Sequence, residues 1–208
     1  MTAAAESLVI LLHGVGADGA NHVPIGDALD GFLPEARFVA PDAPHPFEGG
    51  GFGRQWFSIA GVTGANRAER VAGARAGFDR VVAGEIERAG FSGRLGRVAF
   101  FGFSQGAILA LDALADGRWP VGAVVASSGR LVTPAGPKPA VATPVLLLHG
   151  ESDDVIPASE SRRAGRVLED AGFSVEAHVF PNLGHSVSPE GLRVARAFLS
   201  RSLAPTNS

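Results

Sequence analysis

The sequence predicts an α/β protein with a mostly parallel central sheet and helices on both faces. Short apolar runs alternate along the chain with longer stretches of helical periodicity. Several runs, such as "LVILL" and "VLLLHG", are continuously apolar, which is typical of parallel strands that are covered on both faces. With 208 residues, 46% of them apolar, the chain is long enough to bury a core, and we expect one domain over residues 1–208.

Each element is expected from a local pattern. Strands are expected within six apolar runs, at residues 7–14, 36–41, 96–104, 121–129, 143–150 and 174–180. Helices are expected at about 66–90, 105–116, 159–171 and 188–202. Ser188 is suited to cap the last helix, and Pro189 is tolerated in a first turn. Two segments rich in Pro or Gly, 41–55 and 132–144, are expected to be long loops.

The composition excludes several classes of protein. Charged residues make up 19% of the chain and the net charge is -3, so a nucleic acid or an anionic membrane is not an expected partner. No apolar run approaches the roughly 18 residues of a membrane span, which argues against stable membrane insertion. The absence of cysteine excludes disulfides and thiolate chemistry. The first residues lack a basic region before their short apolar run, which favours a cytoplasmic protein. The oligomeric state stays open, with a homodimer as one option.

The stretch Gly-Phe-Ser-Gln-Gly at residues 102–106 lies between an apolar run and a helix-like one. Gly-x-Ser-x-Gly in this context is the pattern of a nucleophile elbow, a sharp turn between strand and helix that exposes a serine hydroxyl. The glycines avoid Cβ clashes in the turn, and the following helix points its N-terminus at the site. Ser104 is therefore the candidate nucleophile. The competing interpretation is a turn of small residues for close packing.

A serine hydroxyl is a weak nucleophile at neutral pH and needs a base, which in turn needs an orienting acid. In the α/β-hydrolase fold the acid and then the histidine follow the serine along the chain, each just after a strand. Here the fifth predicted strand is followed by Glu151, Asp153 and Asp154, and the sixth by His185. Three positions in this order predict an α/β-hydrolase with a catalytic triad, and the residues alone leave the acid open.

Seven stretches spread over nearly the whole chain resemble the carboxylesterase/phospholipase family of small α/β-hydrolases, which includes acyl-protein thioesterases. They are "LLHGVGADG" at 11–19, "PDAP" at 41–44, "RQWFS" at 54–58, "GFSQGAILAL" at 102–111, "SSG" at 127–129, "LHGESDDVIP" at 148–157 and "LGHSVSPE" at 183–190. The forms "GFSQGA" and "HGxxDxVIP" are more specific than a generic serine elbow. No obvious insertion would form a lid domain, so we expect a minimal form of the fold with an open site.

The resemblance assigns roles to individual residues. It implies that Ser104 is the nucleophile, that His185 is the base and that Asp153 is the acid, because the family's acid lies four residues after the histidine of the "HG" turn. Acyl transfer also needs N–H donors for the oxyanion. The elbow pattern assigns these to the backbone N–H groups of Val15 and Gln105.

The resemblance further implies that Arg54, Trp56 and Phe57 contribute to substrate binding, with plain core packing as the competing interpretation of the aromatic pair. Many relatives have Asp where this chain has Ser58, which leaves the polarity of the pocket open. The other histidines are expected to be turn residues (His13 and His149) or surface or hydrogen-bonded polar residues (His22, His45 and His178). A metal site formed by His13, His149 and His185 is disfavoured, because a turn motif already explains each of them.

The sequence thus predicts a serine carboxylester hydrolase that cleaves short- to medium-chain acyl esters through an acyl-enzyme intermediate. The expected partner is a small-molecule ester, and the chemistry requires no metal or organic cofactor. Thioester hydrolysis and lysophospholipase activity use the same triad and stay open as alternatives. Dienelactone hydrolysis is disfavoured because its nucleophile is typically Cys, and dehalogenation because its elbow carries Asp. A non-catalytic binding protein on this fold is the alternative from another class, although no triad member is missing.

Overall fold

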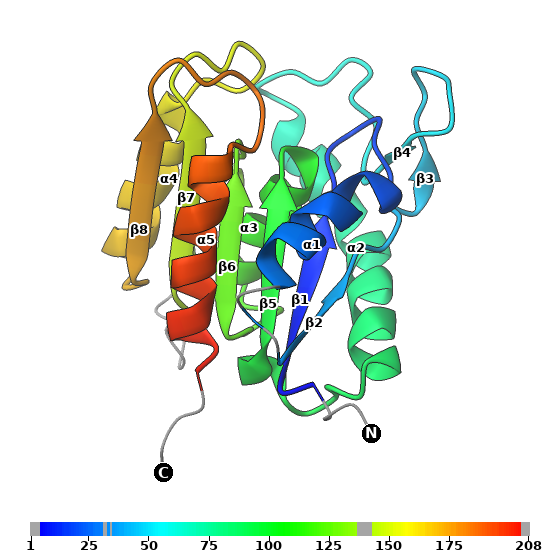
Figure 1. Ribbon diagram of the computed structural model, residues 1–208. Helices are drawn as coiled ribbons and strands as arrows, with labels where there is room; N and C mark the ends of the chain where they lie inside the picture. The colour runs from blue at the N-terminus through cyan, green and yellow to red at the C-terminus, as the bar shows by residue number, and fades with distance from the viewer. Residues whose placement is uncertain (1–4, 31–32, 34, 137–142, 205–208) are drawn as a thin grey trace.

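A computed structural model describes residues 5–30, 33, 35–136 and 143–204 of the chain. In these residues the centre of the fold is a six-stranded sheet with the strand order β2-β1-β5-β6-β7-β8, in which every pairing is parallel (Figure 1). The strands are β1 (Ser7–Leu12), β2 (Ala36–Val39), β5 (Val98–Phe103), β6 (Ala123–Ser127), β7 (Val145–Gly150) and β8 (Val175–Phe180). Each lies within one of the six predicted runs, so the predicted sheet is confirmed.

The continuous apolar runs reflect burial on both faces of the sheet. In β1, alternate residues enter two different cores: Leu8, Ile10 and Leu12 pack on one side, and Val9 and Leu11 pack on the other. This alternation follows from the twofold repeat of a strand. All six residues of β1 are buried, because helices cover both faces.

The predicted helices are also present. They are α2 (Arg67–Arg88), α3 (Gln105–Ala115), α4 (Ser159–Asp170) and α5 (Pro189–Ser202). The side chain of Ser188 caps α5 by accepting a hydrogen bond from the N–H of Gly191 at 3.0 Å, and Pro189 occupies the first turn as expected. Helices α2, α3 and α4 cover one face of the sheet, and α5 lies on the other beside α1 (Val23–Asp30) (Figure 1).

Several short elements were not predicted. Helix α1 follows the 3₁₀ turn η1 (Ala20–His22), and a second 3₁₀ turn, η2 (Leu95–Arg97), precedes β5. Helix α1 has only eight residues and contains Gly26, a poor helix former, which weakens its helical pattern in sequence. Gly26 is nevertheless suited to the fold, since a Cβ there would lie only 3.2 Å from Leu11 Cδ1 and 3.3 Å from Phe38 Cβ. Packing on the sheet therefore offsets a weak local preference.

The predicted loop at 41–55 contains a short antiparallel hairpin, formed by β3 (His45–Pro46) and β4 (Arg54–Gln55). In the second predicted loop, 132–144, the part outside 137–142 contains no helix or strand; residues 137–142 lie outside the described residues. Over the described chain, loops rather than a separate lid domain lie above the carboxyl ends of the strands (Figure 1). No helix in that part of the chain combines the length and the apolar character needed to cross a membrane.

Candidate active site

Ser104 occupies a strained turn directly after β5. Its backbone has φ 52° and ψ -114°. Residues other than glycine rarely adopt a positive φ of this kind. The flanking glycines supply space rather than unusual dihedrals. A Cβ at Gly102 would lie 2.6 Å from the backbone of Ala107, and one at Gly106 would lie 2.1 Å from the carbonyl oxygen of Leu12. The Gly-x-Ser-x-Gly pattern therefore reflects close packing of α3 against β1 and β5, with the strain placed on the serine.

The three side chains of the candidate triad form a continuous chain of hydrogen bonds. His185 Nε2 lies 2.9 Å from Ser104 Oγ, and His185 Nδ1 lies 2.7 Å from Asp153 Oδ2. Because a carboxylate only accepts, we assign the proton to Nδ1, which leaves Nε2 to accept from the serine hydroxyl. Ser104 and Asp153 are each 7% exposed, whereas His185 is more accessible. The arrangement can activate the hydroxyl by removing its proton.

Asp153 is held as a carboxylate by its surroundings. Its Oδ1 accepts hydrogen bonds from the N–H groups of Val155 at 3.0 Å and Ile156 at 2.8 Å. Burial by itself raises the pKa of Asp153, but the hydrogen bonds from Ile156, His185 and Val155 outweigh it, and the net pKa lies below its ordinary value. The neighbouring acids Glu151 and Asp154 are exposed, and Asp153 is the carboxylate that contacts His185.

His149 is buried and contacts the same carboxylate. Its Nε2 lies 2.7 Å from the carbonyl oxygen of Ile156 and 3.2 Å from Asp153 Oδ2. Its Nδ1 lies 2.7 Å from the hydroxyl of Ser161. Burial lowers the pKa of His149 and outweighs the hydrogen bond to Ile156 and the charge of Asp153, so the ring is neutral at pH 7. A proton on Nε2 satisfies both acceptors, which means that His149 fixes the loop that carries Asp153.

The loop after β1 lies beside the nucleophile. A Cβ at Gly14 would be 3.2 Å from Ser104 Cβ. Among the described residues, the N–H groups of Val15 and Gln105 donate no hydrogen bond to a protein acceptor, which leaves both available to an oxyanion. His13 fixes this loop: Nδ1 donates to the carbonyl oxygen of Gly14 at 2.7 Å, and Nε2 accepts from the N–H of Ala43 at 2.9 Å.

The side chain of Gln105 connects the elbow to the segment with the aromatic pair. Its Oε1 accepts from the N–H of Trp56 at 2.8 Å, and its Nε2 donates to the carbonyl oxygen of Phe57 at 2.7 Å. Trp56 is 1% exposed and donates its indole N–H to the carbonyl oxygen of His13 at 2.9 Å. Arg54 donates from Nε and Nη2 to two backbone carbonyl oxygens of the 41–55 segment, 2.9 and 3.1 Å away. Arg54 thus fixes the 41–55 segment, and Trp56 ties the segment that follows it to the loop after β1.

Trp56 and Phe57 also line a cavity of about 640 Å³ between the β3–β4 hairpin and the first turns of α2. Ser58 belongs to its polar lining and donates a hydrogen bond to Glu48. The contribution of Arg54, Trp56 and Phe57 to substrate binding stays a prediction. In the described part of the chain, no group of three or more His, Cys, Asp or Glu side chains is placed to hold a metal ion.

The sequence profile of the phospholipase/carboxylesterase family matches residues 2–203. The chain belongs to this family. It is accordingly a hydrolase of the carboxylesterase type with the α/β-hydrolase fold, as the sequence predicts. The match extends over all the motifs that carry the candidate triad.

Three proteins with esterase or thioesterase names are similar to this chain over most of its length. Esterase YpfH of Escherichia coli (strain K12) is 32% identical over 191 residues, which cover 92% of this chain and 81% of the relative. Acyl-protein thioesterase 1 of Gibberella zeae is 28% identical over 222 residues, covering 96% and 92%. The crystal structure of esterase PE8 has 35% identity and a TM-score of 0.85, and covers 97% of this chain and 95% of its own.

In this member of the phospholipase/carboxylesterase family, the expectation for His22 is wrong. The residue is neither on the surface nor hydrogen-bonded: it is 5% exposed, and both ring nitrogens lack a partner within the described residues. Its ring packs between His13 and Phe103, with centroids 6.2 and 6.3 Å away. Burial, followed by the charge of His13, lowers the pKa of His22 to about 4. No local pattern signals this, because the neighbours of His22 in sequence are not a buried run.

We expect His22→Leu to reduce the loss of folding stability that the protein suffers at acid pH. The unfolded histidine binds a proton near pH 6.5 and the folded one only near pH 4, so the free energy of unfolding falls as the pH drops between these values. Leucine binds no proton. Relative to wild type, the free energy of unfolding of His22→Leu should therefore increase as the pH falls from 6.5 to 4. The increase should approach about 3 kcal/mol at about pH 4 and be smallest above pH 7.

Urea denaturation at about pH 7.5 and about pH 5 measures this difference. The exposed His45 in β3 provides the matched variant His45→Leu. The same acid response in both variants would contradict the assignment of the effect to the burial of His22.

Proposed function

We propose that the chain is a single-domain serine carboxylesterase that acts on short- to medium-chain acyl esters, with Ser104, His185 and Asp153 as its catalytic triad. The observation that carries this proposal is the chain of hydrogen bonds from Ser104 Oγ through His185 to Asp153, at 2.9 and 2.7 Å. The left-handed backbone of Ser104 supports it, because strain of this kind concentrates at functional sites.

In the proposed reaction, Ser104 Oγ attacks the acyl carbonyl carbon while His185 Nε2 takes the hydroxyl proton. The negative charge that develops on the carbonyl oxygen is stabilised by the N–H groups of Val15 and Gln105. His185 then gives its proton to the leaving alcohol, and the acyl group remains on the serine. Water repeats the sequence with His185 as base, which releases the acid and restores the serine.

Asp153 has an indirect part in this cycle. It accepts the Nδ1 proton of His185 in a hydrogen bond, which fixes the ring and stabilises the imidazolium that forms in each transition state. The hydrogen bonds from Val155 and Ile156 keep the carboxylate ionised and directed at His185.

Thioester hydrolysis is the second candidate, supported by the 28% identity to a protein named acyl-protein thioesterase 1. The proposed machinery serves both bonds, because the thiolate is an even better leaving group than the alkoxide. The proposed setting is the cytoplasm, with small molecules and no nucleic acid as partners. A homodimer remains one option for its assembly.

Hydrolysis of p-nitrophenyl esters with acyl chains from acetyl to palmitoyl tests the proposal, with S-acyl thiol esters of the same chains as the comparison. We expect turnover that is highest at short or medium chains and higher on oxygen esters. Higher specificity for the thiol esters would favour the second candidate. A failure to hydrolyse either series, together with a failure of a fluorophosphonate to label Ser104, would overturn both.

A further inference from the structure

A cluster of three arginines lies near the carboxyl edge of the sheet that carries the candidate triad. We call Arg67, Arg130 and Arg163 the arginine cluster. Arg67 is the first residue of α2, Arg130 lies three residues after the end of β6, and Arg163 is in the first half of α4. Helices α2 and α4 cover the same face of the sheet and begin near the carboxyl ends of its strands (Figure 1). Three separate elements thus bring positive charge to one region.

The segment that follows β6 and contains Arg130 passes beside the nucleophile elbow. The N–H of Ser104 donates to the carbonyl oxygen of Ser127, the last residue of β6, at 2.9 Å. Gly129 packs so closely on the first turn of α3 that a Cβ there would lie 2.6 Å from Ala107 Cβ. Arg130 is the next residue, and its side chain is only 13% exposed. The backbone of Arg130 therefore lies close to the elbow, and its guanidinium is partly withdrawn from water.

The carboxylates nearby do not balance the arginine cluster. Within the described residues, Glu160 is the carboxylate that forms ion pairs with the cluster, at 3.5 Å to Arg130 Nη1 and 3.1 Å to Arg163 Nη2. Arg67 is half-buried and forms no ion pair with a described residue. Burial lowers the pKa of Arg130, and the charges of Arg67 and Arg163 lower it further, against Glu160 and Asp153. The three arginines of the cluster outnumber the two carboxylates, Glu160 and Asp153, that act on Arg130, so positive charge is left in excess.

We propose that the arginine cluster binds an anionic group of the substrate, a carboxylate or a phosphate, so that the preferred esters carry such a group on the acyl or the alcohol side. This inference rests on the proposed esterase function. A guanidinium binds both anions through paired N–H donors. Arg130, next to the elbow, is the expected contact, and Arg67 and Arg163 raise the local concentration of anionic substrate.

The first test compares esters that differ only in charge. Mono-4-nitrophenyl adipate and 4-nitrophenyl hexanoate have the same chain length and place either a carboxylate or a methyl group at the acyl end. On the alcohol side, 4-carboxyphenyl butyrate and 4-(butyryloxy)phenyl phosphate are compared with phenyl butyrate. We expect a preference of about tenfold in kcat/KM for the anionic ester of at least one pair, mainly through KM. Added NaCl should reduce this preference, since salt screens the attraction.

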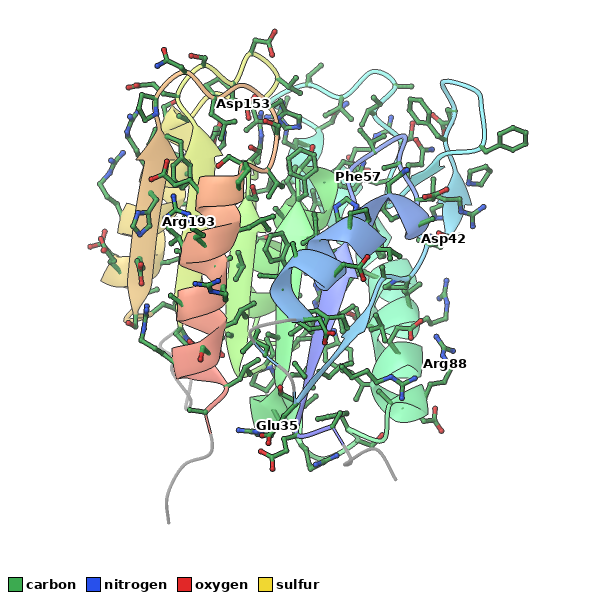
Figure 2. All side chains as sticks on the ribbon, in the orientation of Figure 1. Glu35, Asp42, Phe57, Arg88, Asp153 and Arg193 are labelled. Carbon is green, nitrogen blue, oxygen red and sulfur yellow. The ribbon has the colours of Figure 1, made fainter. Side chains whose placement is uncertain are left out.

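Substitutions of the arginines then test which of them causes the preference for anionic esters. Arg130→Gln should abolish the preference while leaving kcat on the neutral esters within about twofold, and Arg67→Gln should reduce the preference about threefold. Arg67→Gln breaks no ion pair with a described residue, so it keeps the test open if Arg130→Gln fails to fold. Arg88→Gln is the matched control, because Arg88 ends α2 at the opposite edge of the molecule from Asp153 (Figure 2).

The outcomes separate this inference from the function on which it rests. Equal kcat/KM on the charged and neutral esters of every pair would overturn the anion site and leave the esterase proposal standing. A preference that persists in both Arg130→Gln and Arg67→Gln would overturn the assignment to the arginine cluster. Failure on all the esters would overturn the esterase proposal itself. An acyl-side or an alcohol-side preference identifies which part of the substrate reaches the cluster, and the phosphate ester distinguishes the two anions.

Discussion

Replacing Ser104 with alanine is expected to lower kcat on the best p-nitrophenyl ester by roughly 10⁴-fold or more. The substitution removes the attacking oxygen and the acceptor of the acyl group, while His185 and the oxyanion donors stay in place. Folding should be kept, because alanine and serine meet the same strain at φ 52°. Initial rates with a matched circular dichroism spectrum check the prediction.

Ser128 supplies a matched control for this substitution. It too is buried, with φ 50°, and its hydroxyl has no hydrogen-bond partner within the described residues. Ser128→Ala therefore removes a hydroxyl at a similar φ near the same edge of the sheet, and we expect activity within about threefold of wild type. Near wild-type turnover in Ser104→Ala would exclude the acyl-enzyme mechanism and bring the non-catalytic binding protein forward.

Asp153→Asn is expected to lower kcat by about 10³- to 10⁴-fold with little change in KM. The amide oxygen is needed to accept the N–H groups of Val155 and Ile156, as Oδ1 does now. The amide NH₂ would then face His185 Nδ1 and His149 Nε2, where Oδ2 lies. Because the NH₂ can only donate, His185 is driven to the tautomer with its proton on Nε2, which cannot accept the proton of the serine.

Asp154→Asn is the control for this change. Asp154 is the next residue along the chain and is exposed, so its variant should retain wild-type kcat within about twofold. The rate of labelling by a fluorophosphonate gives a second readout, because it reports the activation of Ser104 without turnover. A greater loss in Asp154→Asn than in Asp153→Asn would show that the acid is misassigned.

Much of the fold could be predicted because its signals are local. Strands buried on both faces appear as continuous apolar runs. The start of α5 is indicated by Ser188 as the cap and Pro189 in the first turn. Helix α1 was missed because it is short and contains Gly26, a poor helix former, and it is positioned by close packing of Gly26 against Leu11 and Phe38 of the sheet. Tertiary packing overrides local preference there.

For the candidate site too, some features could be predicted from the sequence and others depend on the tertiary structure. The sequence by itself determined the type of chemistry, since a serine elbow followed by carboxylates and then a histidine at strand ends is an ordered local pattern. The residues alone left Glu151, Asp153 and Asp154 open, and family resemblance selected one of them. Only the tertiary structure decided the hydrogen bonds themselves, because Ser104 and His185 lie 81 positions apart in the chain and meet at 2.9 Å.

Other features depend entirely on how distant elements meet. The packing of His22 against Phe103 and the gathering of Arg67 near Arg130 each join residues that are far apart in the sequence. Burial and charge proximity arise from packing, and packing sets the pKa values and the excess charge that function would use. The sequence therefore determined which groups are present, and the tertiary structure decided which of them act on one another.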